Sequence, residues 1–325
     1  MKINKSRVDN ILFITLSNIG DAVLTLPVLE ALKRNFIGAD ITVMSSLRTR
    51  ELFEADPSVS KIIVYNKHMS LYKKLQLGLR LRRSGFDLVV DLRHSFFPLI
   101  IGSRYRTACF RKKRAGMHKR DKHLKELEPI GIKTESVPFL ISVGREDKLN
   151  VTSLLTEYGL LPEDNIVAIA AGAKSHIKQW QTSGFIRLSN KITKEMGFKV
   201  ILIGDINDAP INDKIKTAGL NEVYDFTGKT NLRELAYLLS LCKVLVTNDS
   251  APLHIASAQG IPTVAIFGPT DEKKYGPLAP RSIVIRKNLR CSPCEKASCR
   301  FDLECMKEIS ADEVFNSVRD ILARE

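Results

Sequence analysis

The sequence has no apolar stretch long enough to cross a membrane as a helix, because its longest apolar stretches have only the length of strands. Residues 1–7 lead directly into a strand-like segment and contain neither the apolar core nor the cleavage site of a signal peptide. The chain is therefore predicted to stay in the cytoplasm. Its 325 residues, 44% hydrophobic and 26% charged, are typical of a soluble protein with two domains.

The motifs of several common enzyme classes are also absent. No G-x-G-x-x-G follows the first predicted strand, which argues against a nicotinamide-dependent enzyme. The sequence has no P-loop, no G-x-S-x-G of a serine hydrolase and no convincing D-x-D of a metal-dependent sugar transferase. We therefore predict no cofactor.

The positive charge of the chain is concentrated in one segment. The net charge is +14, and residues 67–125 contain 17 Lys and Arg against 3 Asp and Glu, so this segment accounts for the whole excess. It could be a solvated basic face. It could also bind an anionic partner, such as nucleic acid, anionic lipid or a phosphorylated glycolipid.

Four of the six cysteines fall close together near the C-terminus, in the spacing C-x2-C-x4-C-x5-C. They are Cys291, Cys294, Cys299 and Cys305. Clustered thiols could bind zinc or an iron–sulfur cluster, but this spacing matches no standard pair of metal-binding knuckles. A cytosolic chain argues against a disulfide framework. We favour reduced structural thiols, with a metal site and regulatory disulfides as the alternatives.

Apolar, strand-like segments alternate with helical segments in residues 1–160, and the alternation restarts in residues 161–325. This β-α-β pattern predicts two doubly wound α/β domains with parallel sheets, joined by a linker at 159–165. The last helix, about 310–325, could pack back on the N-terminal domain. The strands are expected at 11–16, 41–44, 62–65, 86–92, 166–171, 199–203, near 223, and at 244–246, 263–267 and 282–286. The longer helices are expected at 22–35, 71–83, 119–128, 146–158, 180–196, 211–218, 232–241, 253–258 and 311–323.

A polar stretch, N-D-S-A-P-L-H at residues 248–254, lies between a strand-like run and a short helical run. Such a turn lies at the C-terminal edge of a parallel sheet, where open α/β sheets bind ligands. The free N–H groups and the dipole of the following helix favour an anion there. We predict that the turn binds the diphosphate of a nucleotide-linked donor, through Asp249, Ser250, Ala251, His254 and, after the next strand, Thr270. Asp249 or Ser250 could instead cap the helix, and His254 could be structural.

Two other groups of residues could act at the same sheet edges. Asp21, at the turn after the first strand, could be a general base that removes a proton from an acceptor hydroxyl, or a helix N-cap. Lys174, His176 and Lys178 follow the first strand of the second domain and could neutralise a leaving diphosphate, or form a solvated loop. Trp180, the only tryptophan, is predicted to anchor the core or the start of a helix.

Several motifs together resemble glycosyltransferase family 9, the ADP-heptose:lipopolysaccharide heptosyltransferases. They are S-x-x-G-D-x-x-x-x-L-P at 17–27, G-A followed by K-x-W at 172–180, F-T-G and L-x-E-L at 226–235, N-D-S-A-P-L-H at 248–254, F-G-P-T-D at 267–271, and the tail with Cys294, Cys299 and Cys305-Met306. The resemblance covers nearly the whole chain.

The resemblance implies a GT-B fold, with two Rossmann-like doubly wound domains facing a central cleft, the first binding the acceptor and the second the donor. It implies inverting, metal-independent transfer of a heptose from ADP-heptose to the inner core of lipopolysaccharide or lipooligosaccharide, with Asp21 as the base. Lys178, Ser250 and Ala251 would bind the diphosphate, beside Asp249 and His254. Asp208 is the candidate for the ribose, where the family is expected to have a glutamate. Ala251 stands where the family usually has glycine.

The resemblance also gives the basic segment a partner, a Kdo-lipid A or extended core glycolipid at the inner face of the inner membrane. The enzyme would then be cytoplasmic and peripheral to that anionic membrane, with no nucleic acid partner. The predicted acceptor contacts are Gly20, Arg111, Lys112, Lys113, Arg114, Lys119 and Arg120. The alternatives are a family 9 transferase with another donor or acceptor, a GT-B-fold sugar-nucleotide epimerase, and a basic nucleic-acid-binding α/β protein, which explains the charge but not the motifs.

Overall fold

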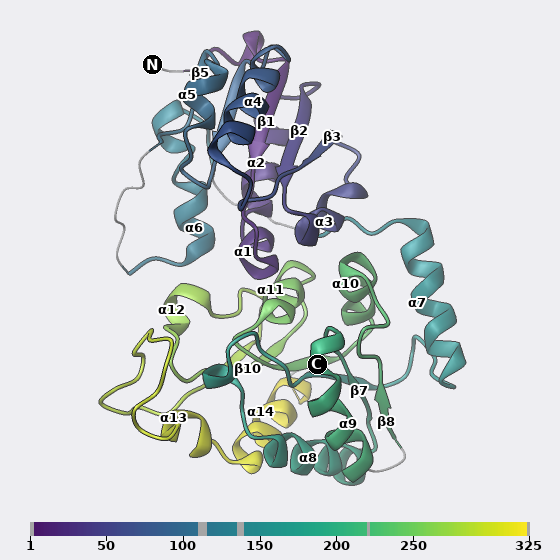
Figure 1. Ribbon diagram of the computed structural model, residues 1–325. Coiled ribbons are helices and arrows are strands. Elements are labelled where there is room, and N and C mark those ends of the chain that lie inside the picture. The colour runs from purple at the N-terminus through teal and green to yellow at the C-terminus, as the bar shows by residue number, and fades with distance from the viewer. Residues whose placement is uncertain (1–2, 110–115, 135–139, 220–221, 324–325) are drawn as a thin grey trace. The chain divides into compact units, whose positions relative to one another are not determined.

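The computed structural model describes residues 3–109, 116–134, 140–219 and 222–323 (Figure 1). The chain divides into two compact units, Met1–Ser142 and Val143–Glu325, each built around one parallel sheet. Within the described ranges, no helix combines the length and the apolar character needed to span a bilayer. The two parallel sheets confirm the predicted α/β class with doubly wound domains.

The first unit has a five-stranded sheet in the order β3-β2-β1-β4-β5, with every neighbouring pair parallel. Its strands are β1 (Asn10–Ile14), β2 (Asp40–Ser45), β3 (Val59–Val64), β4 (Leu88–Asp91) and the short β5 (Tyr105–Arg106), which the sequence analysis did not predict. Its helices are α1 (Ile19–Val23), α2 (Leu26–Asn35), α3 (Glu51–Glu54), α4 (Leu71–Arg82), α5 (Phe97–Ile101) and α6 (Lys119–Leu124), with 3-10 turns at Lys5–Arg7, Leu47–Thr49 and Glu128–Ile130.

Alternate residues of β1 face opposite sides of this sheet, as the two-residue period of a strand requires. Leu12 and Ile14 pack in a cluster with residues of α4 and α5. Phe13 points to the other face, where its ring meets Phe53 of α3 edge-on at 6.4 Å between centroids. The sheet is therefore covered on both faces, as the continuous apolar runs predicted.

The helix predicted at 22–35 is two helices, and this is a correction. The break lies at Thr25, whose hydroxyl donates to the carbonyl oxygen of Ala22 at 2.6 Å and so satisfies the end of α1. Pro27 lies in the first turn of α2. Because proline has no N–H to continue the hydrogen bonding of α1, the chain restarts as a new helix. Asp21 consequently lies on a separate five-residue helix directly after β1.

The second unit has a six-stranded parallel sheet in the order β11-β10-β9-β6-β7-β8. Its strands are β6 (Ile166–Ala170), β7 (Lys199–Leu202), β8 (Val223–Asp225), β9 (Val244–Asn248), β10 (Thr263–Ile266) and β11 (Ile283–Ile285). Its helices are α7 (Arg145–Glu157), α8 (Thr182–Lys191), α9 (Ala209–Ala218), α10 (Leu232–Ser240), α11 (Ala251–Ala258), α12 (Glu272–Tyr275), α13 (Glu304–Lys307) and α14 (Ala311–Leu322), with 3-10 turns at His176–Lys178 and Ile206–Asp208 and a π-helical turn at Ile192–Met196.

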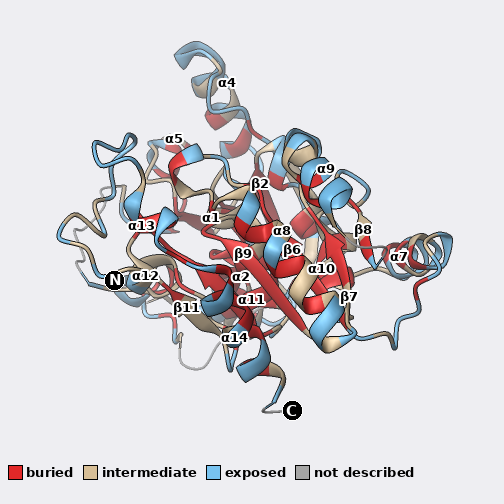
Figure 2. Cartoon of the chain, turned by 90° about the horizontal axis from the view of Figure 1, so that it is seen from below, coloured by how far each residue is buried: buried red, intermediate tan, exposed pale blue. Residues whose placement is uncertain are grey.

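The core of this unit lies between its sheet and a layer of helices that includes α8 and α14, and the strands β6, β9 and β10 are buried throughout (Figure 2). Val314, Phe315 and Val318 of α14 are buried in this core. The apolar face of the last helix is therefore occupied within its own unit. That this helix also packs back on the N-terminal domain stays a prediction. On the opposite face of the sheet, Leu253 of α11 packs against Phe267.

The division between the units lies at 142/143, whereas the sequence placed the boundary at 160/161. The difference is helix α7, which packs against α10 of the second unit. Asp147 at the start of α7 forms an ion pair with Arg233 of α10, with 2.9 Å between Oδ2 and Nε. The pattern of the sequence shows that α7 is a helix, but an ion pair spanning 86 residues cannot be read from it.

Candidate functional site

The predicted donor residues lie at the point where the strand order of the second sheet reverses. From β6 the chain proceeds outward to β7 and β8, then crosses back to β9 on the other side of β6. The loops that follow β6 and β9 therefore leave adjacent strands in opposite directions, and open α/β sheets usually bind ligands at such a point. Asn248, at the end of β9, ties these loops together. Its Oδ1 accepts a hydrogen bond from the backbone N–H of Trp180 at 3.0 Å, and its Nδ2 donates to the Ala171 carbonyl at 2.8 Å.

An ion pair joins the same two loops. The Lys178 ammonium lies 2.6 Å from Oδ2 of Asp249, whose side chain is only 7% exposed. Lys178 ends the 3-10 turn His176–Lys178 after β6, and Asp249 directly follows β9. The structure therefore brings together two predicted donor residues that lie 71 positions apart, and it fixes a cation at the C-terminal edge of the sheet. Lys174 and His176 are exposed on the same loop.

Ser250 and Ala251 begin helix α11 beside this ion pair. Ser250 is the N-cap by backbone position, but its side chain makes no capping hydrogen bond, and its Oγ lies 3.1 Å from Oγ1 of Thr247. The side chain therefore does not consume the first N–H groups of α11, which are the groups that bind anions at a helix start. Ala251 has a right-handed helical backbone, so a Cβ is compatible with its conformation where the family usually has glycine.

Asp208, the candidate for the ribose, lies over the turns that follow β6 and β7. A Cβ on Gly172 would lie 1.9 Å from its Oδ1, and a Cβ on Gly204 would lie 2.6 Å from its Oδ2. Both positions therefore require glycine for this carboxylate to approach. Burial raises the pKa of Asp208, and the negative charge of the Asp205 carboxylate raises it further. The backbone N–H of Asp205 donates a hydrogen bond to the Asp208 carboxylate at 3.0 Å, which lowers the pKa in part. The structure thus brings Asp208 to the same sheet edge as Lys178.

The remaining predicted donor residues are buried. His254 lies on α11, one turn after Ser250, and is 5% exposed. Thr270 follows β10 and is also buried. Trp180 is buried as predicted; its indole N–H donates to the Ile309 carbonyl at 2.9 Å, and its ring packs edge-on against Phe185. The tryptophan is therefore a core anchor that holds the loop carrying Lys178.

Asp21 lies at the corresponding edge of the first sheet, after its central strand β1. Asn18, and not Asp21, is the N-cap of α1, so Asp21 is not an N-cap residue. The carboxylate of Asp21 is partly exposed and accepts a hydrogen bond from the Asn18 amide, with 3.0 Å between Nδ2 and Oδ2. Gly20 precedes it in the same first turn. An oriented carboxylate at this edge has the chemistry of a general base.

Arg93 is a candidate that the sequence analysis missed. It follows β4, which pairs with β1, and the order of this sheet reverses between these two strands. Its Nη1 donates to Oγ of Ser17 at 2.6 Å, and its guanidinium lies over the ring of Tyr65 at 4.9 Å. The sequence does show that Arg93 is a basic residue directly after a buried strand. It does not stand out, because its segment contains 17 basic residues.

The predicted acceptor contacts at Arg111, Lys112, Lys113 and Arg114 lie outside the described residues. Lys119 and Arg120 open helix α6, and both are half-buried. The Arg120 guanidinium pairs with the Asp121 carboxylate, with 2.8 Å between Nε and Oδ1. These two positions stay predictions.

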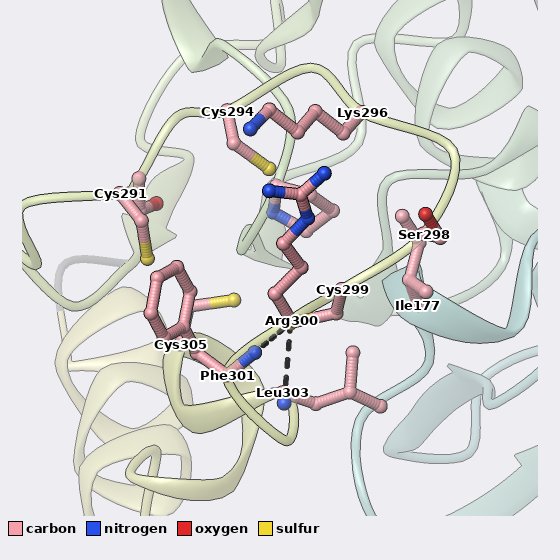
Figure 3. A pocket seen from close by; sticks show the side chains of 12 residues that line it. Ile177, Cys291, Cys294, Lys296, Ser298, Cys299, Arg300, Phe301, Leu303 and Cys305 are labelled. Atoms are coloured by element: carbon pink, nitrogen blue, oxygen red, sulfur yellow. Dashed lines mark hydrogen bonds between the residues drawn. The ribbon is translucent and has the colours of Figure 1, made fainter.

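The four clustered thiols all line one pocket, together with Arg300 and Phe301 (Figure 3). All six cysteines are free. Cys299 Sγ accepts N–H groups from Phe301 at 3.3 Å and Leu303 at 3.4 Å. Burial, and then the three neighbouring thiols, raise the pKa of Cys305. Among the residues that the structure describes, no group of three or more His, Cys, Asp or Glu side chains is placed to hold a metal ion.

We expect the cysteines to differ in their reaction with iodoacetamide. Cys299 is exposed, whereas Cys242 is buried, and burial raises the pKa of its thiol well above the usual range. Because only an accessible thiolate is alkylated, Cys242 should react at least about tenfold more slowly than Cys299. Mass spectrometry of peptides after short pulses measures both rates. All six should react alike in denaturant, and equal rates in the native protein would contradict the burial described.

Comparison with known proteins identifies the family. A profile of glycosyltransferase family 9 (heptosyltransferase) matches residues 74–304. The lipooligosaccharide heptosyltransferase 2 of Campylobacter jejuni is 27% identical over 316 residues, covering 93% of this chain and 96% of that protein. A family 9 glycosyl transferase from Veillonella parvula superposes with a TM-score of 0.85 at 22% identity, with 98% of both chains covered.

The structure of the E. coli ADP-heptose lps heptosyltransferase II gives a TM-score of 0.79 at 22% identity, covering 97% of this chain and 99% of that one. The likeness to these structures confirms the predicted GT-B fold class. The family profile covers well over half of the sequence, including the K-x-W and N-D-S-A-P-L-H motifs whose residues meet at the edge of the second sheet. The chain therefore belongs to glycosyltransferase family 9 (heptosyltransferase) and is a glycosyltransferase.

Proposed function

We propose that this enzyme transfers a heptose from ADP-heptose to the inner core of a lipopolysaccharide or lipooligosaccharide. The observation that carries the proposal is the Lys178–Asp249 ion pair beside the start of α11, at the point where the strand order of the second sheet reverses. The names of the similar proteins, an ADP-heptose lps heptosyltransferase and a lipooligosaccharide heptosyltransferase, support this donor and acceptor.

The second unit would stabilise the leaving diphosphate. Negative charge grows on this group as the bond between sugar and phosphate breaks, so fixed cations and N–H groups there lower the barrier. An ammonium has three N–H donors, so the bond from Lys178 to Asp249 leaves others for phosphate. The N–H groups and hydroxyl at Ser250 and Ala251 would add to this, and Asp208 would bind the ribose. No step of this scheme requires a metal.

The first unit would bind and activate the acceptor. Asp21 would take the proton of the acceptor hydroxyl as that oxygen attacks the anomeric carbon from the side opposite the leaving group, which inverts the configuration. The transition state would have oxocarbenium character, as in glycoside hydrolysis. Gly20, Lys119 and Arg120 would contact the anionic acceptor. The enzyme would act in the cytoplasm at the inner face of the inner membrane, where each Lys or Arg near an anionic surface contributes about 1 kcal/mol.

A donor screen tests the proposal. The full chain is incubated with ADP-, GDP- and UDP-linked sugars and with Kdo-lipid A acceptors of defined core length, and the products are read by mass spectrometry. We expect the mass of one heptose to be added from ADP-heptose, at the same rate with and without EDTA. Transfer only from another nucleotide sugar would contradict the proposed donor. A loss of transfer with EDTA that Mg²⁺ restores would contradict the metal-free scheme.

A further inference from the structure

Helix α4 has an apolar face that no described residue of its own unit covers. Leu71, Tyr72, Leu75 and Leu79 are 83%, 69%, 47% and 48% exposed. In a helix of 3.6 residues per turn these positions lie within about 100° of the circumference, so they form one stripe. The helix is largely exposed in Figure 2. Single exposed leucines are ordinary, but a continuous stripe along a helix is not.

This stripe is distinct from the face with which α4 packs on the sheet. Leu81 is buried in a cluster with Phe97 and Ile101 of α5. Gly78 is also buried, and a Cβ there would lie 2.6 Å from Cγ2 of Ile100, so the two helices are in close contact. Leu81 and Gly78 hold α4 against its own unit. The exposed leucines are therefore not needed to keep the helix in place.

The exposed apolar residues are also concentrated around this helix. Of the 14 large apolar residues that are exposed within the described ranges, six lie on α4 or at α5, where Phe96 and Leu99 join the four of the stripe. The contact between α4 and α5 places both sets on neighbouring helices of one unit. The surface formed by these six residues is named the α4–α5 face.

The charge of the segment selects one kind of partner. Residues 67–84 contain six Lys and Arg and no acidic residue. Lys73 and Arg80 are exposed on α4, about 80–100° around the helix from the edge of the apolar stripe. A helix that lies in the surface of an anionic bilayer has both apolar and cationic side chains. The apolar side chains lie among the acyl chains, and the cations lie at the headgroups. A nucleic acid would be attracted by the cations but would leave the leucines exposed to water.

We propose that the α4–α5 face docks on an anionic lipid bilayer. This inference rests on the proposed function, because an acceptor with a lipid anchor is held in such a surface. It assigns the apolar part of membrane binding to α4, a helix of the basic segment 67–125 that contains none of the residues predicted to contact the acceptor. The face would concentrate the enzyme where its acceptor lies, and it would take no part in the chemistry.

Co-sedimentation of the full chain with vesicles tests the proposal. Vesicles of phosphatidylcholine with phosphatidylglycerol should bind the wild type, and vesicles of phosphatidylcholine alone should bind it at least about tenfold more weakly. The triple variant Leu71→Gln, Leu75→Gln, Leu79→Gln should lose at least about tenfold in affinity for the anionic vesicles. The double variant Lys73→Gln, Arg80→Gln should lose affinity and show a weaker dependence on salt.

The matched control is Ile37→Gln, Leu149→Gln, Leu161→Gln, which removes three apolar residues elsewhere that are at least as exposed as the three leucines of α4. It should bind vesicles like the wild type. Equal binding by the α4 triple variant, or a wild type that binds single-stranded RNA but no vesicles, would overturn the docking surface. Transfer to a detergent-dispersed acceptor separates the two proposals. The α4 triple variant should transfer sugar to this dispersed acceptor at the wild-type rate. If the wild-type protein binds vesicles but transfers no sugar to either form of the acceptor, only the proposed function is contradicted.

Discussion

Replacing Asp21 with asparagine is expected to lower the turnover number roughly 10²–10⁴-fold, which is the range of a positioned general base. Asparagine has nearly the same size and could still accept a hydrogen bond from Asn18, so α1 should keep its structure. Its amide cannot take up the proton of an attacking hydroxyl. The proposed donor residues Lys178 and Ser250 belong to the other unit, so the affinity for ADP-heptose should not change.

Steady-state kinetics and donor titration by calorimetry measure these two effects separately. Asn18→Ala is the matched control, because it removes the hydrogen bond to Asp21 and leaves the carboxylate in place. It should lower turnover by much less than Asp21→Asn. Turnover of Asp21→Asn within a factor of two of the wild type would show that another group is the base.

The parts of the site that could be predicted from the sequence are those that depend on local pattern. Apolar runs of strand length, each followed by a polar turn and a helical stripe, predicted the parallel sheets and placed Asp21, Lys178 and Asp249 at strand ends. Since the C-terminal ends of parallel strands lie at one edge, Lys178 and Asp249 were expected near each other, and the 2.6 Å ion pair agrees with this.

The parts that could not be predicted depend on contacts between distant residues. The amide of Asn248 ties the turn after β6 to the end of β9, and Asp208 lies against two glycines, one after β6 and one after β7. Arg93 reaches Ser17 across 76 positions. Each of these depends on the strand order and on side-chain rotamers, which a hydrophobic pattern does not encode. Pro27 marks the start of α2 in the sequence, but the helical spacing of apolar residues continues across it from 23 to 32, so the pattern alone predicts one helix.

Removing the Lys178 ammonium is the second change with a large expected effect. Lys178→Ala should lower the efficiency of transfer roughly 10²–10³-fold, as the loss of one fixed group that stabilises developing charge does in other enzymes. The donor should also bind more weakly, because its diphosphate is already charged in the ground state. Lys174→Ala is the matched control: this lysine is exposed on the same loop, and its loss should change the efficiency of transfer by less than a few-fold.

The Lys178→Ala variant also leaves the carboxylate of Asp249 without its ion-pair partner. Breaking a fully buried pair costs about 3–5 kcal/mol, but the Lys178 side chain is 32% exposed, so we expect a loss of about 1–2 kcal/mol in the free energy of unfolding. The double variant Lys178→Ala, Asp249→Asn removes the unpaired charge. It should recover most of the stability in denaturant titrations but not the transfer. If transfer recovered together with stability, Lys178 would have a structural role in joining the loops after β6 and β9, and the leaving group would be stabilised by other groups.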